Sequence, residues 1–455
     1  MTTHVTGRPA AGMESKTPET ERVQRFLHSF LQDFPAPLTA EDPLPVKMQS
    51  RALSHEEVEG ELMELALRLF GNRKAPPSLA ATLTRAAVEN VLQAELAAFV
   101  VEQRTEEEQE AAVTLLDAEP LQRFFYNALR LVCQQWREQL PPSIEPATPR
   151  LRVSIHAIRN TRRKMEDRHV AIPEFNQLFG LKDSVDHAFF AVFDGHGGVD
   201  AANYAATHVH VNLAHHAEFA TNPAKALRES FAYTDTMFLK QAKRKKLRSG
   251  TTGVSALIAG SMLHVAWLGD SQVMLVRRGE AKTLMDAHKP EREDERERIE
   301  ALGGFVAYMG CWRVNGTLAV SRAIGDIDQK PYVSGEADGA TFELAGSEDY
   351  LLLACDGFFD AVRPCEVAGL VLEHLKGSNG DCCGTAEKLV AAAKQGGSSD
   401  NITVMVVFLR DPSSILADGL RPRPVSEAEE NSGNGMFHFF TSETKNGMND
   451  CSNGH

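Results

Sequence analysis

The sequence predicts an α+β protein in which a helical N-terminal region precedes a larger domain of short strands and few helices. Apolar residues recur at helical spacing from about residue 19 to residue 139. From about residue 151 to residue 410, short apolar runs alternate with glycine turns. The 455 residues exceed what one core of ordinary size can hold, so several segments are expected.

Changes in amino-acid composition along the chain predict where these segments begin and end. Prolines between residues 140 and 150 break the helical pattern, and the sequence after residue 411 is polar and rich in glycine and asparagine. The predicted organisation is a disordered segment 1–18, a helical region 19–139, a Pro-rich linker 140–150, a strand-rich domain 151–410 and a disordered tail 411–455. The apolar stripes of the helical region fit either core packing or a groove for a partner.

Charge and cysteine content limit the partners and the compartment. The net charge of −14 argues against nucleic acid, because phosphate backbones select basic surfaces. No apolar run approaches the roughly 18 residues that span a bilayer, and the N-terminus lacks the apolar core of a signal peptide. The seven cysteines have no metal-knuckle spacing and are expected to be reduced thiols. We therefore expect a cytoplasmic protein, with the nucleus as the alternative, and no membrane partner.

The most informative stretch is an apolar run, residues 189–193, that leads directly into Asp194-Gly195-His196-Gly197-Gly198. The run predicts a buried strand, and the glycines predict a tight turn at its end. One carboxylate and one imidazole would then lie at the mouth of a sheet, beside backbone without side chains. Such a place suits a hard cation or a phosphate.

The same pattern recurs in the domain. Residues 350–355 lead into Asp356-Gly357, residues 263–268 lead into Gly269-Asp270, and Asp400 precedes the apolar run 402–408. One Asp-Gly pair is most often a plain turn. Several carboxylates at strand ends in one domain are expected to converge, and their mutual repulsion then requires a cation.

Oxygen donors without a Cys or His pair at zinc spacing favour Mg²⁺ or Mn²⁺. Two such ions about 3.5–4 Å apart can bridge a water, lower its pKa and hold a phosphoryl group for in-line attack. Arg162 suits the phosphate oxygens, and His196 suits a proton donor to the leaving alkoxide. The simpler interpretations are an exposed charge cluster for Arg162 and a turn residue for His196. Neither a phosphate-binding cysteine loop nor a nucleotide-binding glycine loop is present.

Taken together, these motifs resemble the metal-dependent serine/threonine protein phosphatases, the type 2C or PPM family, over about residues 151–410. The matching segments occur in the family's order: 162–167, 194–198, 249–253, 269–271, 288–290, 298–299, 303–304, 316–326, 356–360 and 399–403. The resemblance implies two antiparallel sheets packed face to face with helices outside, and metals at one end of this sandwich. One departure is Gln272, where the family often has arginine.

The resemblance also implies roles for individual residues. Two Mn²⁺ or Mg²⁺ ions would be held by Glu166, Asp194, the carbonyl of Gly195, Asp356 and Asp400, with Asp167 acting through water. Arg162 would hold the substrate phosphate, His196 would be the general acid, and Asp270 and Asp360 would lie beside a third, weaker metal.

Within the family, the helical N-terminal extension looks most like that of the calcium/calmodulin-dependent protein kinase phosphatases. This implies phosphorylated protein kinases as substrates, both calmodulin-dependent and p21-activated, and Rho-family exchange factors as partners of the N-terminal helices. A scaffold without activity is the alternative, but the metal ligands are complete. A two-metal phosphodiesterase or nuclease is disfavoured by the acidic balance. The basic stretch 243–246 fits a solvated helix end, a site that attracts acidic phosphopeptides, or a nuclear-entry signal.

Overall fold

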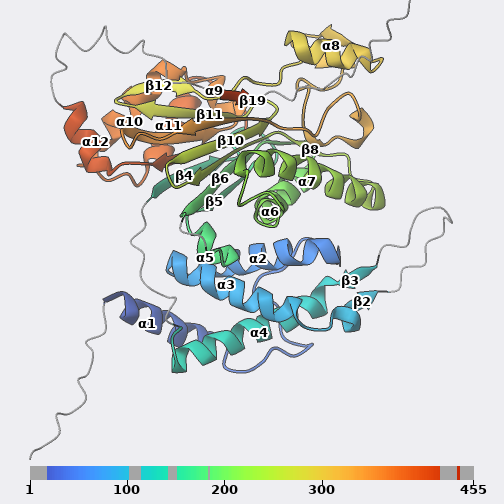
Figure 1. Cartoon of the computed structure of the whole chain (residues 1–455), viewed down its shortest axis with the longest axis vertical. Helices are drawn as coiled ribbons and strands as arrows, with labels where there is room; N and C mark the ends of the chain where they lie inside the picture. The colour runs from blue at the N-terminus through green and yellow to red at the C-terminus, as the bar shows by residue number, and fades with distance from the viewer. Residues whose placement is uncertain (1–17, 102–113, 142–150, 183–184, 421–437, 441–455) are drawn as a thin grey trace, which may run out of the picture. The chain divides into compact units, whose positions relative to one another are not determined.

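The computed structural model describes residues 18–101, 114–141, 151–182, 185–420 and 438–440 (Figure 1). The chain divides into two units, residues 1–148 and 149–455. Among the described residues, no helix is both long and apolar enough to cross a membrane.

The first unit is helical. Its elements are α1 (Pro18–Asp33), α2 (His55–Asn72), α3 (Pro77–Leu92) and α4 (Ala118–Glu138), with a 3-10 turn (Leu96–Phe99) and a small sheet of β1 (Ala52–Ser54), β3 (Leu115–Asp117) and β2 (Val100–Val101). The Asp117 carboxylate caps α4 by accepting the Glu119 N–H at 3.0 Å. The predicted stripe of α4 is buried at Leu121, Phe125 and Leu129, so it packs within its own unit.

The second unit is a sandwich of two antiparallel sheets, which confirms the predicted fold class. The six-stranded sheet has the order β19-β16-β10-β9-β6-β5 and the five-stranded sheet has the order β12-β11-β17-β18-β4. The first sheet comprises β19 (His438–Phe440), β16 (Asp338–Glu343), β10 (Met262–Leu268), β9 (Gly253–Ala259), β6 (His187–Phe193) and β5 (Arg168–Ile172). The second comprises β12 (Glu280–Thr283), β11 (Gln272–Arg277), β17 (Glu348–Ala354), β18 (Ile402–Phe408) and β4 (Arg152–Ile158).

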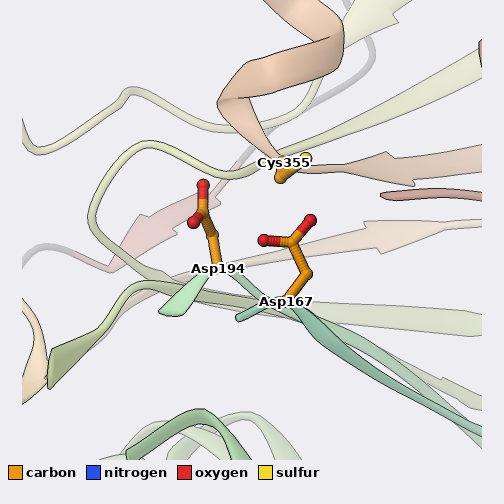
Figure 2. A group of neighbouring side chains, drawn as sticks. All are labelled: Asp167, Asp194 and Cys355. Carbon is orange, nitrogen blue, oxygen red and sulfur yellow. The ribbon is translucent and has the colours of Figure 1, made fainter. Parts of the chain in front are cut away.

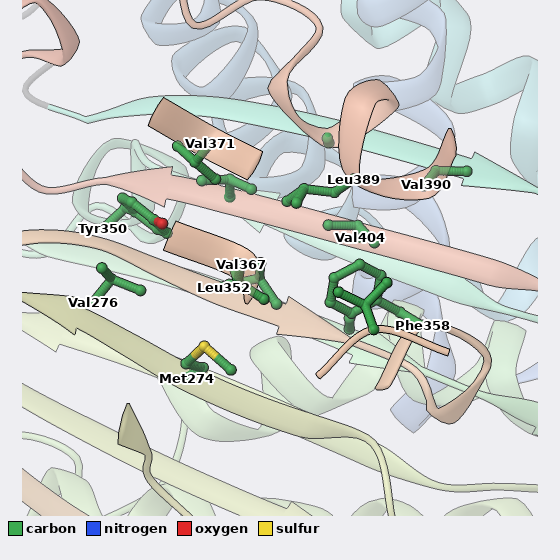
Figure 3. Packing of buried hydrophobic residues seen from close by; sticks show 14 of the residues in the cluster. Met274, Val276, Tyr350, Leu352, Phe358, Val367, Val371, Leu389, Val390 and Val404 are labelled. Atoms are coloured by element: carbon green, nitrogen blue, oxygen red, sulfur yellow. The ribbon is translucent and has the colours of Figure 1, made fainter. Parts of the chain in front are cut away.

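Helices cover both outer faces of the sandwich (Figure 1). On the six-stranded sheet lie α6 (Asp200–Ala214) and α7 (Pro223–Lys245), and on the five-stranded sheet lie α10 (Pro364–Gly377) and α11 (Thr385–Gln395). Leu351 and Leu353 face the core between the sheets, whereas Leu352 packs outward among the residues of α10 and α11 (Figure 3). A strand segment buried on both faces favours apolar residues at successive positions, which explains the apolar run 350–354 that follows the two acidic residues at the start of β17.

Smaller elements complete the unit. A three-stranded sheet has the order β15-β8-β7, formed by β15 (Ile324–Gly325), β8 (Gly250–Thr251) and β7 (Gly195–His196). The hairpin of β13 (Val306–Tyr308) and β14 (Trp312–Val314) follows α8 (Glu293–Ala301). The short helices are α5 (Phe175–Phe179), the 3-10 turn Ile327–Gln329, α9 (Asp356–Phe359) and α12 (Pro412–Gly419).

The predicted tail is corrected near its start. The sequence analysis expects disorder from residue 411, but Pro412–Gly419 form α12. Asp411 caps this helix by accepting the Ser413 N–H at 2.9 Å, and the buried Ile415 packs into the core beneath α10. In addition, His438–Phe440 pair with β16. The rest of the predicted tail, residues 1–17 and linker residues 142–150 lie outside the described residues.

Candidate metal centre and active site

Antiparallel pairing brings strand ends with carboxylates to one end of the sandwich. The last residue of β6, Phe193, lies opposite Arg168, the first residue of β5. Asp194 follows the end of β6 and Asp167 precedes the start of β5, so the two carboxylates become neighbours across the ladder.

The other sheet repeats this arrangement. Ala354 at the end of β17 lies opposite Val404 of β18, so Asp356 and Asp400 arrive at the same end. The start of β18 also pairs with the end of β4, where Ile158 lies opposite Ile402. The loop that follows β4 therefore delivers residues 159–167 to the same place.

These residues line a cleft of about 660 Å³. Most of the predicted site residues contribute to its wall: Arg162, Glu166, Asp194, Gly195, His196, Asp270, Asp356 and Asp400. Two do not. Asp167 is buried and lies outside the lining, and Asp360 is exposed and also lies outside it. Asp360 is nevertheless close enough for its charge to raise the pKa of Asp356.

The deepest part of the site is a group of Asp167, Asp194 and Cys355, which can bring one ligand atom each within 4.8 Å of one another (Figure 2). Asp167 Oδ2 accepts a hydrogen bond from Thr403 Oγ1 at 2.7 Å. Its other oxygen, Oδ1, is buried without a hydrogen-bond partner among the described residues. A buried carboxylate oxygen without a donor is costly, and a cation would satisfy it.

The electrostatics of the carboxylates also fit a cation. Burial, together with the charges of Asp167, Asp356 and Asp270, raises the pKa of Asp194 well above its ordinary value. Burial also raises the pKa of Asp356 to about 7 and that of Asp167 to about 6. Without compensation these groups retain protons at pH values where aspartate is normally ionised.

The donor chemistry selects the kind of cation. Burial raises the pKa of the Cys355 thiol well above its ordinary value, so it stays protonated and is a poor metal ligand at neutral pH. The remaining donors are carboxylate and carbonyl oxygens, which hard ions such as Mg²⁺ and Mn²⁺ prefer. The residues present therefore fit the predicted ions better than zinc.

Asn401, in the turn before β18, forms hydrogen bonds with the loop that contains Arg162 and holds the two segments together. Its side-chain oxygen accepts the Glu166 N–H at 2.7 Å, and its Nδ2 donates to the Arg159 and Lys164 carbonyls at 2.9 Å each. Arg162 Nη2 in turn donates to Asp400 Oδ2 at 2.5 Å. More than half of the Arg162 side chain remains exposed at the cleft, where a phosphate could reach it.

His196 has a partner that the sequence analysis did not assign. Its Nε2 lies 2.8 Å from Asp326 Oδ2. Burial would lower the pKa of His196, but the hydrogen bond and charge of Asp326 outweigh it, so this pKa is raised. A side chain at Gly250 would collide with both groups, since an added Cβ would lie 2.4 Å from His196 Nε2 and 2.0 Å from Asp326 Oδ2. The only sequence signal for Asp326 is its place at the end of motif 316–326.

The turn that carries Asp270 is held from two directions. The Lys289 ammonium forms an ion pair with the Asp270 carboxylate. His288 Nδ1 accepts the Gly269 N–H at 3.2 Å, and its Nε2 lies 3.0 Å from Asp338 Oδ2. This pattern requires a neutral ring with its proton on Nε2, consistent with burial lowering the pKa of His288. These groups support the turn of Asp270. Gln272, where the family often has arginine, is the first residue of β11.

Comparison with known proteins identifies this arrangement. The family described as Protein phosphatase 2C matches residues 151–402. The chain belongs to the protein phosphatase 2C family. It is 61% identical to human Protein phosphatase 1F over 417 residues, covering 90% of this chain and 92% of that one. It is 52% identical to mouse Protein phosphatase 1E, covering 81% of this chain and 49% of that one.

Solved structures agree on the fold. A Caenorhabditis elegans sex determining protein superposes with a TM-score of 0.68 at 22% identity, covering 88% of this chain and 96% of that one. A serine-threonine phosphatase 2C from Toxoplasma gondii superposes with a TM-score of 0.50 at 24% identity, covering 59% and 96%. The protein is a serine/threonine protein phosphatase of a metal-dependent family, and its substrates are phosphoproteins.

The raised carboxylate pKa values predict how metal-free phosphatase responds to pH. The unfolded chain loses these protons at about pH 4, whereas folded Asp167 and Asp356 keep theirs up to about pH 6 and about pH 7. The contribution of these groups to stability therefore falls as the pH rises from about 4 to about 7. We expect Mn²⁺ to raise the melting temperature more at pH 8 than at pH 5.5, measured by thermal denaturation against EDTA. The Asp356→Asn variant should show a smaller Mn²⁺ effect. An equal rise at both pH values would contradict this account.

The Asp326 contact predicts a selective defect. Asp326→Asn keeps the shape but removes the charge that holds His196, so proton delivery to a poor leaving group should suffer. We expect kcat for a phosphothreonine peptide to fall by roughly 10- to 100-fold. Turnover of p-nitrophenyl phosphate, whose leaving group needs no proton, should fall much less. Asp328→Asn, an exposed neighbour, is the matched control. Equal losses on both substrates would argue against proton delivery through His196.

Proposed function

We propose that the phosphatase hydrolyses phosphoserine and phosphothreonine on proteins with two divalent cations, Mn²⁺ or Mg²⁺. The observation that carries this is the convergence of buried carboxylates, one exposed arginine and one carboxylate-paired histidine in a single cleft. The proposed ligands are Glu166, Asp167, Asp194, the Gly195 carbonyl, Asp356 and Asp400. Such ions supply an activated water and neutralise charge on the phosphoryl group.

The side chains supply binding and proton transfer. Arg162, already oriented by Asp400, would donate to the phosphate oxygens, because a guanidinium bonds phosphate through two parallel N–H groups. His196 would protonate the leaving serine or threonine oxygen. With Nε2 held by Asp326, the proton for the leaving group would come from Nδ1. An alkoxide is a poor leaving group, so this proton matters for a phosphoprotein substrate.

We further propose that Asp270 and Asp360 belong to a third, weaker metal site. The Lys289 ammonium already neutralises Asp270. Burial raises the pKa of Asp360, and the charge of Lys289 opposes part of this rise. A metal ion at this position must compete with Lys289 for the same carboxylates. That competition is a physical reason for weaker binding.

For substrates, we propose phosphorylated protein kinases, both calmodulin-dependent and p21-activated, whose signalling the enzyme would down-regulate in the cytoplasm and also in the nucleus. The support is the resemblance of the N-terminal region and its helical fold. Rho-family exchange factors are proposed as partners of these helices. Phe124 and Leu131 of α4 are 37% and 50% exposed, which gives the helical unit apolar side chains for such a contact.

The activity itself is tested with one ligand carboxylate. Asp356→Asn removes a charge from the centre of the cluster, so we expect hydrolysis of a phosphothreonine peptide at saturating Mn²⁺ to fall by at least about 100-fold. Asp286→Asn, an exposed aspartate away from the cleft, should retain full activity. EDTA should abolish the wild-type activity. Near-normal turnover by Asp356→Asn would refute its assigned role.

The kinase proposal is tested by competition between protein substrates. The full-length enzyme is given an activated calmodulin-dependent kinase, an activated p21-activated kinase and phosphorylated casein, and kcat/KM is measured by phosphate release. We expect at least about tenfold higher kcat/KM on the kinases, because docking on the helical unit adds to binding at the cleft. Equal values on all three substrates would reject selective recognition of kinases.

A further inference from the structure

Three basic side chains at the cleft have no part in the reaction described above. Arg163, Lys164 and Arg313 line the cleft together with Arg162. Arg163 and Lys164 are exposed, and Arg313 is half-buried. They come from two segments about 150 residues apart, the β4–β5 loop and strand β14.

These three cations are available for a ligand. Within the described part of the chain, none of them forms an ion pair, whereas Arg162 is paired with Asp400. Arg313 donates from Nη1 to the Thr317 carbonyl at 2.6 Å, which fixes its direction and uses one nitrogen of the guanidinium. Charged groups at a binding cleft without partners of opposite charge favour an anionic ligand.

The backbone beneath Arg163 and Lys164 is fixed. The Lys164 carbonyl accepts from Asn401 Nδ2 at 2.9 Å, and the Arg163 carbonyl accepts from Arg159 Nη1 at 3.4 Å. The Lys164 carbonyl bond ties the loop to the turn before β18, so the backbone from which the two side chains project is held beside the metal centre.

Arg313 is directed by the alternation of its strand. Its neighbour Val314 is buried in a small core with Ile299 and Val320, and Trp312 stacks under the Arg296 guanidinium at 4.8 Å. Neighbouring side chains in a strand point to opposite faces, so Arg313 points away from this core and toward the cleft that it lines.

We propose that Arg163, Lys164 and Arg313 form an anion-binding rim that selects phosphorylated sites with further acidic groups on neighbouring residues. This inference rests on the proposed function and names its substrate class. The reacting phosphate needs one guanidinium, Arg162, so the other three cations are free to meet flanking groups. The shared chemistry of those groups is a carboxylate or a second phosphate, both of which guanidinium and ammonium groups bind.

The rest of the protein does not supply such a preference. The chain has a net charge of −14, so its overall field repels an acidic peptide. A preference for acidic substrates must then arise locally.

The test uses three phosphothreonine peptides of identical length. One has glutamates on both sides of the phosphothreonine, one has glutamines, and one has a second phosphothreonine two residues away. Phosphate release by the full-length, Mn²⁺-loaded enzyme gives kcat/KM for each. We expect the glutamate and doubly phosphorylated peptides to exceed the glutamine peptide by about fivefold or more, and the ratio to shrink at high salt.

Charge reversals then assign the effect to the rim. Lys164→Glu and Arg313→Glu should each bring the glutamate-to-glutamine ratio to about one or below. Lys376→Glu, an exposed lysine of α10 outside the cleft, makes the same charge change and should leave the ratio unaltered. Arg162→Ala should lower kcat/KM for both peptides equally, because the Arg162 side chain would contact the reacting phosphate that both peptides share.

The outcomes separate this inference from the function on which it rests. Equal kcat/KM for all three peptides, or a preference that survives Lys164→Glu and Arg313→Glu, would overturn the rim while hydrolysis itself upholds the proposed function. Preference for the doubly phosphorylated peptide alone would support the rim with phosphate as its ligand. No hydrolysis of any peptide by the folded, Mn²⁺-loaded enzyme would overturn the proposed function and the rim with it.

Discussion

The repulsion among buried carboxylates at one end of the sandwich is the constraint on which the site depends. Asp167, Asp194 and Asp356 are held close by the ends of paired strands, and burial removes the water that would screen them. The fold therefore holds charges that it cannot neutralise with its own side chains, and a divalent cation relieves the repulsion. Stability and catalysis are coupled through the same ions, because the free energy of binding them is also free energy of folding.

Only a rigid frame can hold such a repulsive arrangement. β17 and β18 are buried at every position, and β6 is buried along its whole length, so the strands that end at the cluster are fixed by packing on both faces. The carboxylates lie within two residues of the ends of these strands. Gly357 shows how tight the fit is, since a Cβ there would lie 2.0 Å from the Asn401 carbonyl oxygen. The strand ends cannot move apart without disrupting the core.

Local features of this protein can be predicted from the sequence, whereas contacts created by the pairing of distant strands cannot. An apolar run that ends in Asp-Gly is visible within ten residues, so the strands before Asp194 and Asp356 and the carboxylates themselves could be predicted. The contact between His196 and Asp326 spans 130 residues and depends on the order β15-β8-β7, which no local pattern reveals. The helix α12 was missed because its eight residues are too few for a clear helical pattern, and its stability comes from a cap and from Ile415 against the core.

The distribution of charge in the cleft explains how one site can hold cations and still attract an anionic substrate. Five carboxylates and four basic side chains line the cleft, and without a cation the raised pKa values of Asp194 and Asp356 keep part of the carboxylate charge masked by protons. Asp270 is buried and Asp356 is half-buried, whereas Arg163 and Lys164 are exposed at the rim. Two divalent cations would more than neutralise the interior and leave the rim unopposed. Attraction of a phosphoprotein would then depend on occupancy of the metal centre, because bound cations make the local field more positive.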